Sequence, residues 1–227
     1  MDGWERKALR AAEFVAYPAL AGAAFCVLAL GVVTWLPALA AAATALQSWR
    51  TDGSGRCFTA TLRAFPAQWR RLRGEALVGT AVLLLCVSNT VFLVGRSGPA
   101  LALLPVQAVL LAAAAVYAVA LAVTTTLQPD AKRRELHQAA AVFAFGSPRR
   151  TLGLVAAVAV LPLSVLPVPL GPVLLGPTLP LMAALSLAAP VTPAGLRVAP
   201  GAYGRGPSVR ASSAAPHGPA RPAPSPL

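Results

Sequence analysis

The sequence predicts an all-α fold: a polytopic bundle of membrane helices, with interfacial amphipathic helices and a disordered C-terminal tail. Hydrophobic residue types make up 57% of the 227 residues and charged types only 11%, whereas a soluble domain carries about 25% charged residues. The charges are also unevenly placed, because four long stretches contain no Asp, Glu, Lys or Arg. Each stretch reaches the ~20 residues that a helix needs to cross a bilayer core. They are residues 14–49, 76–95, 97–129 and 151–196.

The first part of the chain predicts two membrane helices after a short cytoplasmic head over 1–13. Residues 14–33 are long enough for a first span. Pro37 is tolerated in the first turn of a helix, so we expect a second, Ala-rich helix over 37–49. Its length of ~20 Å is less than the ~30 Å hydrocarbon core, so it either crosses a thin region or re-enters, packed against its neighbours. The alternative is one long tilted helix over 14–49.

Residues 56–73 predict a basic amphipathic helix that lies in the membrane interface. Apolar residues recur there at spacings of four and three, which places them within a narrow arc of a helix. Anionic lipid is the expected contact of the basic side, and an acidic loop of a partner membrane protein is the alternative. Pro66 predicts a kink or a division into two short helices. The predicted membrane-interface residues are Phe58, Leu62, Phe65, Trp69 and Leu72 on the apolar side and Arg56, Arg63, Arg70 and Arg71 on the basic side.

The rest of the chain predicts four further spans, a second interfacial helix and a tail. Residues 131–146 combine basic residues near the start with apolar side chains later, which favours a helix in the interface. The tail over 193–227 has eight prolines among Ser, Gly, Ala and Arg, a composition that predicts disorder. We expect the spans over 76–95, 100–127, 151–167 and 173–190, and all spans together form one transmembrane domain over 14–192.

The distribution of Arg and Lys predicts which loops lie in the cytoplasm. Basic residues in short loops beside membrane helices favour the cytoplasmic side. Residues 50–75 carry six, 128–150 carry five and the tail carries four, whereas the 95–99 turn has one and the 167–172 turn has none. The basic loops are separated by pairs of spans, so these loops and the C-terminus are expected in the cytoplasm. If 14–49 forms a hairpin, the N-terminus lies there as well.

Polar groups inside the spans are few and neutral. Asn89 and Gln107 are the best candidates for the polar lining of a pathway for a sugar-like or other polar ligand, although hydrogen bonds between helices are the more usual role of such groups. Proton relays use ionisable residues, and no assigned span contains Asp, Glu, Lys, Arg or His. Glu75 is the nearest acid to a span. Because it follows Arg71 and Arg73, we expect it to pair with arginine and to stay solvated.

Catalytic and metal chemistry have little support in the sequence. Three cysteines form no C-x-x-C pair, and the two histidines, His137 and His217, lie far apart. These residues are too few and too scattered to predict a zinc or haem site, a cofactor or an activated nucleophile. A net charge of +12 would favour nucleic-acid binding in a soluble domain. Here the positive-inside distribution accounts for the charge, so no nucleic-acid partner is expected.

Several segments resemble the YesL-like family of bacterial integral membrane proteins. The run from Val33 to Pro37 leads into an Ala-rich helix that ends Thr44-Ala45-Leu46, and the basic amphipathic stretch follows. Later, Ala139 to Phe145 precedes Ser147-Pro148-Arg149-Arg150-Thr151-Leu152 at the start of a span. The resemblance covers roughly residues 5–190. Ala40 to Ala43 stand where the family usually has Thr-x-Gly-Pro. Membership would imply an uncharacterised protein of a family sometimes associated with carbohydrate uptake, and it would carry over no catalytic residue.

These observations favour a multi-pass protein of the cell membrane that is not an enzyme. Its expected role is an accessory or structural component of a membrane assembly, with the lipid bilayer, anionic lipids and a membrane-protein partner as contacts. A small transporter or channel with a neutral polar pathway is the first alternative. A membrane enzyme that acts on lipid is the second, with less support.

Overall fold

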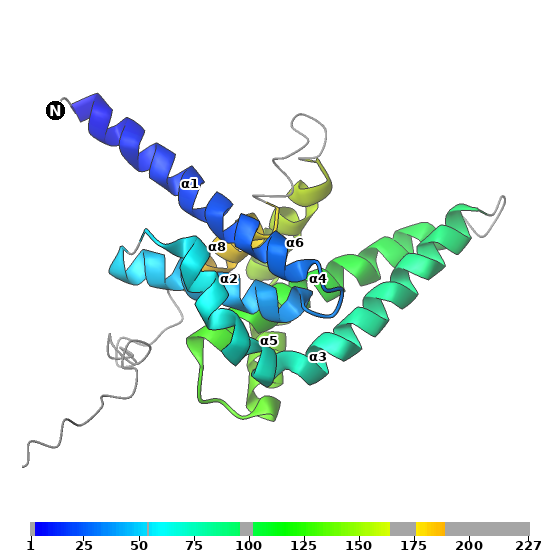
Figure 1. Cartoon of the computed structure of the whole chain (residues 1–227). Coiled ribbons are helices and arrows are strands. Elements are labelled where there is room, and N and C mark those ends of the chain that lie inside the picture. The colour runs from blue at the N-terminus through cyan, green and yellow to red at the C-terminus, as the bar shows by residue number, and fades with distance from the viewer. Residues whose placement is uncertain (1–2, 54, 96–101, 164–175, 189–227) are drawn as a thin grey trace, which may run out of the picture. The chain divides into compact units, whose positions relative to one another are not determined.

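The computed structural model describes residues 3–53, 55–95, 102–163 and 176–188. These residues form helices joined by turns and contain no strand, which confirms the predicted all-α class (Figure 1). The described helices are α1 (Gly3–Ala29), α2 (Trp35–Asp52), α3 (Cys57–Val94), α4 (Leu104–Leu127), α5 (Arg133–Phe145), α6 (Pro148–Leu163) and α8 (Thr178–Ala188).

Three of these helices are long and apolar enough to cross a membrane: the Ala12–Ala29 part of α1, α3 and α4. Their length and composition identify the chain as a membrane protein. The predicted spans over 151–167 and 173–190 are described only in part, as α6 and the short apolar α8. The remainder of those two spans and the predicted tail lie outside the described residues.

Helices α1 and α2 form an antiparallel hairpin. The chain reverses over residues 30–34, where the Thr34 hydroxyl shares its hydrogen bond between the carbonyls of Leu28, in the last turn of α1, and Gly31, in the turn. Beyond the turn, the Tyr17 and Trp49 rings pack with their centroids 5.4 Å apart. This contact places the middle of α1 beside the last turn of α2. The alternative of one long helix over 14–49 is therefore wrong.

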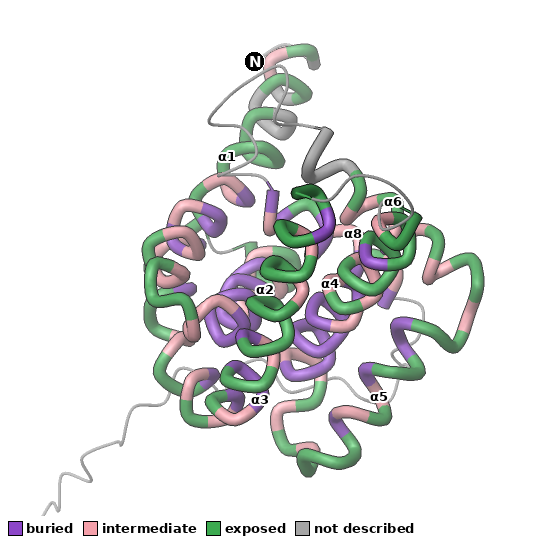
Figure 2. The backbone as a smooth tube through the Cα atoms, turned by 90° about the vertical axis from the view of Figure 1, so that its right-hand side faces the viewer, coloured by how far each residue is buried: buried purple, intermediate pink, exposed green. Residues whose placement is uncertain are grey.

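Helix α2 lies at the centre of the described helices. It packs against α1, α3, α4 and α8, and Figure 2 shows the buried residues concentrated on α2 and on the neighbouring part of α4. Alanine side chains allow this burial, because they let helix backbones approach closely. The buried residues of α2 are Leu36, Pro37, the run Ala38 to Ala43, Ala45 and Leu46.

Helix α3 corrects one prediction about the amphipathic segment. The helix is continuous from Cys57 to Val94, so an interfacial helix over 56–73 separate from a span over 76–95 is wrong. Pro66 lies inside the helix without dividing it. Gly74, at the expected boundary, costs only about 1 kcal/mol relative to alanine, which does not end a helix that packs along α2.

The buried face of α3 is also rotated from the predicted apolar arc. Thr61, Gln68, Leu72 and Glu75 are buried toward the neighbouring helices, a face centred roughly 70° from the predicted arc at 100° per residue. Leu72 belongs to both faces. The rotation follows from packing, because small and polar side chains fit against the alanines of α2. The aromatic residues of the predicted arc, Phe58, Phe65 and Trp69, therefore lie beside the buried face.

The later part of α3 and the start of α4 extend together from the other helices as a hairpin (Figure 1). We call this unit the α3–α4 hairpin and define it as residues 76–94 and 104–115. Large apolar side chains are exposed along both of its helices. On α3 they include Leu77, Leu84, Leu85, Val91 and Phe92, and on α4 Val106, Val109 and Leu110.

Helix α5 falls within the second predicted interfacial segment, 131–146. Leu136, Ala140 and Phe143 are buried against α4 and α6, at the spacing of one helical face. Val142 is exposed on the other side. The sequence pattern therefore located this helix, whereas its position in the membrane interface stays a prediction.

Candidate functional site

Arg71 connects the middle of α3 to the end of α4. Its guanidinium donates hydrogen bonds to the backbone carbonyls of Thr125, Gln128 and Ala131, at 3.3, 2.9 and 3.1 Å. The last carbonyls of a helix have no partner within the helix and carry partial negative charge. Arg71 therefore caps α4 and fixes the turn that leads into α5.

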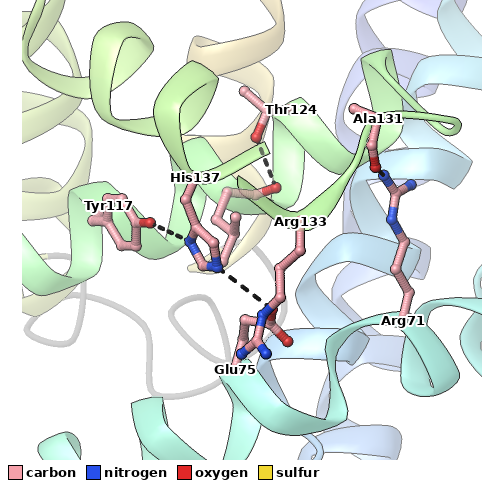
Figure 3. A network of polar contacts seen from close by, with 8 residues as sticks. Arg71, Glu75, Tyr117, Thr124, Ala131, Arg133 and His137 are labelled. Carbon is pink, nitrogen blue, oxygen red and sulfur yellow. Dashed lines mark hydrogen bonds and ion pairs between the residues drawn. The ribbon is translucent and has the colours of Figure 1, made fainter. Parts of the chain in front are cut away.

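Glu75, one turn further along α3, lies at the centre of a polar network (Figure 3). Its side chain is only 7% exposed, and one carboxylate oxygen lies 2.5 Å from Nε of Arg133 and 3.4 Å from Nε2 of His137. Nδ1 of His137 lies 2.7 Å from the Tyr117 hydroxyl. Helices α3, α4 and α5 each supply part of this network, so their relative placement depends on it.

A groove of about 370 Å³ opens from this network between α3 and α4. Its polar end is formed by Glu75, Tyr117, Arg133 and His137. The rest of the lining is almost entirely apolar and includes Val78, Val82 and Leu83 on α3 and Leu111, Ala114 and Ala115 on α4. A concave, mostly apolar site with a few polar groups at one end is typical of ligand sites.

A second pocket, of about 580 Å³, lies beside the Glu75–Arg133 pair. Its lining is basic, because Arg70, Arg71, Arg73 and Arg133 all contribute to it. We call it the basic pocket. Glu75 and Arg133 line both the groove and the basic pocket, so the two spaces adjoin.

The predicted interface residues lie along one side of α3 without forming its buried face. Phe58, Phe65 and Trp69 are half-buried, and Leu62 is exposed. Phe65 and Trp69 stack with their ring centroids 6.2 Å apart. The role of these residues at the membrane interface stays a prediction. Among the predicted arginines, Arg56 and Arg63 are exposed, and Arg70 and Arg71 belong to the basic pocket.

Asn89 and Gln107 lie close together, as a shared role requires. The Asn89 amide donates to Oε1 of Gln107 at 2.9 Å, and the Gln107 amide donates to the carbonyl of Cys86 at 3.1 Å. Neither residue lines the groove or the basic pocket. Their geometry favours the usual role of holding two membrane helices together.

Sequence reasoning missed the network around Glu75. Glu75 was expected to be solvated and to pair with a neighbour on its own helix. It is instead buried, and its arginine partner, Arg133, lies 58 positions further along the chain. Arg133 and His137 are four residues apart on α5, so the sequence indicated that they share a helix face. Nothing in the sequence indicated that this face meets Glu75.

Comparisons with known proteins return no relative. No protein-family model matches the chain, and neither a curated protein nor a solved structure is similar to it. The resemblance to the YesL-like family therefore stays a prediction. Within the residues that the structure describes, no three His, Cys, Asp or Glu side chains lie together as metal ligands would.

Proposed function

We propose that the chain is a multi-pass protein of the cell membrane that acts as a non-enzymatic accessory or structural component of a membrane assembly. The observation that carries the proposal is the α3–α4 hairpin. It extends from the other helices and exposes large apolar side chains along both of its helices. Such a surface meets lipid or another membrane helix, and helix pairing in a bilayer is driven by packing and polar contacts rather than by the hydrophobic effect.

The proposed orientation places the segments 50–75 and 128–150 in the cytoplasm. Contacts between them support a common side, because Arg71 bonds to the Ala131 carbonyl and Arg133 pairs with Glu75. The positive-inside rule then assigns that side to the cytoplasm. The family resemblance adds carbohydrate uptake as the process that the assembly would serve.

Site-specific photo-crosslinking tests the accessory role. A photoreactive amino acid at Leu85, which is exposed on the hairpin, is expected to crosslink a partner membrane protein in intact cells. The matched position is Val27 on α1, which is also apolar and exposed. A protein adduct specific to Leu85 supports the proposal. Adducts to lipid alone at both positions would contradict it.

A small transporter is the second candidate. The observation that favours it is the buried Glu75, which contacts His137 at the end of the groove, because a buried ionisable group at the end of a membrane span can take part in proton coupling. Purified protein in proteoliposomes distinguishes the two candidates. Uptake of a polar solute driven by a pH gradient, and lost in Glu75→Gln, would favour the transporter. The accessory role predicts no uptake with either form.

A further inference from the structure

The groove and the basic pocket together have the shape and polarity of a site for one amphiphilic molecule. The groove is apolar along its length, the basic pocket is lined by arginines, and they meet at the Glu75–Arg133 pair. An occupant that fits both needs an apolar chain and an anionic head. The sequence predicted general contact between anionic lipid and the basic side of the helix over 56–73. The structure adds a defined site, which is formed by residues of α3, α4 and α5.

The dimensions of the groove match one leaflet of a bilayer. Its residues on α3 run from Glu75 to Cys86, a rise of ~16 Å along a helix. Half of the ~30 Å hydrocarbon core is close to this length. Sequence hydropathy places the start of the hydrocarbon at residue 76, the first of an uncharged run. The basic pocket therefore lies at the level of phosphate groups and the groove at the level of acyl chains.

The basic pocket retains charge that the protein itself does not use. Arg71 is committed to three backbone carbonyls, and Arg133 is paired with Glu75. Arg70 is exposed and bonds only to the carbonyl of Pro66 on its own helix. Arg73 is exposed, and within the described part of the chain it has no hydrogen bond or ion pair. Two guanidinium groups are thus available to a phosphate.

We propose that this site binds one anionic phospholipid. The phosphate and head group contact Arg70 and Arg73 in the basic pocket, beside Arg133. One acyl chain lies in the groove between Val82 of α3 and Ala114 of α4. The lipid fills the space between the two helices and links the α3–α4 hairpin to α5.

Native mass spectrometry of the purified full chain tests the site. Phosphatidylglycerol is titrated against phosphatidylcholine with the same acyl chains, and one phosphatidylglycerol is expected to bind with preference. In Arg70→Gln/Arg73→Gln, its affinity should fall about 25-fold, since each basic residue near a membrane surface contributes a factor of about five. The matched control is Arg63→Gln/Arg149→Gln, which removes two exposed charges outside both spaces and should leave the affinity unchanged.

A second pair of variants tests the acyl chain. Ala114→Phe fills the groove from one wall, whereas Ala108→Phe places the same side chain on an exposed part of α4 outside the groove. Only the first should weaken phosphatidylglycerol binding. Glycerol 3-phosphate at millimolar concentration should not displace the lipid, because it lacks the chain.

Four results would each overturn the proposal. Equal binding of phosphatidylcholine would show that charge does not select the occupant. An equal loss in the Arg63→Gln/Arg149→Gln control would show that the effect is general to positive charge. Unchanged binding in Ala114→Phe, or displacement by glycerol 3-phosphate, would show a phosphate site without an acyl chain in the groove.

Discussion

Glu75 is the residue whose environment differs most from what its sequence neighbours suggest. It follows Arg73 and precedes a long uncharged run, so a solvated position at a helix end was the simplest expectation. Its side chain is buried because α5 covers it and supplies Arg133 and His137. A buried carboxylate is stable only with such partners, so this part of the structure depends on contacts between distant segments.

Removing Arg133 should destabilise the fold more than removing its neighbour. Arg133→Ala leaves Glu75 buried with His137 as its remaining partner, and we expect a loss of about 1–3 kcal/mol in the free energy of unfolding. The Arg133 side chain is 69% exposed, and solvent screening keeps the loss below that of a fully buried pair. The matched variant, Arg134→Ala, removes an exposed charge and should cost less than about 0.5 kcal/mol.

Chemical unfolding in detergent micelles measures both losses. Adding Glu75→Gln to Arg133→Ala should recover part of the stability, because the buried group is then neutral. An identical stability of Arg133→Ala and Arg134→Ala would mean that the pair contributes nothing.

Substitutions of Arg71 distinguish the contribution of its planar guanidinium group from that of its positive charge. Arg71→Ala removes three bonds to carbonyls around the end of α4, and we expect a loss of about 1.5–3 kcal/mol, the usual range for bonds to a charged group. Arg71→Lys keeps the charge but lacks the planar fork, so it should recover only part. Arg63→Ala, on the exposed side of the same helix, should change stability little. Full recovery with lysine would contradict the capping role.

At the scale of elements, hydropathy and proline positions located the helices well and their boundaries less well. The break near residues 30–34 followed from Pro37, because proline favours the first turn of a new helix, and α2 begins at Trp35. The predicted helix boundary between 56–73 and 76–95 was wrong, because α3 is continuous there. A change from amphipathic to fully apolar sequence does not by itself end a helix. Which face of α3 is buried depends on α2, so the local pattern could not give it.

The alanine run of α2 should be intolerant of larger side chains. Ala42 is fully buried, and Ala42→Leu would add three carbons between closely packed helices, at a cost of about 1–3 kcal/mol. Ala67→Leu makes the same change at an exposed position of α3 and should be nearly neutral. Unfolding in detergent compares the two. Equal stability would show that α2 is not the packed centre of the described helices.

At the scale of the whole molecule, the composition predicted the class of protein, and the structure describes three helices that can cross a membrane. The network around Glu75, the groove and the basic pocket could not be predicted, because each needs residues from α3 and α5 that meet only in the fold. The sequence could not predict a substrate or a partner, because apolar side chains do not distinguish one ligand from another.

The central claim is that this is a membrane protein whose basic segments around α3 and α5 share the cytoplasmic side. Cysteine labelling in intact cells tests it most directly, in a background in which Cys26, Cys57 and Cys86 are replaced by alanine. Single cysteines are placed at the exposed positions Thr59 and Gln138, and at Ser97, which lies between α3 and α4 in the sequence.

A membrane-impermeant thiol reagent should label Ser97→Cys in intact cells. It should label Thr59→Cys and Gln138→Cys only after the membrane is permeabilised, since both lie in arginine-rich segments. Labelling of Gln138→Cys in intact cells, with Thr59→Cys protected, would contradict the account, because it would place on opposite sides of the membrane two segments that Arg71 and the Glu75–Arg133 pair hold together.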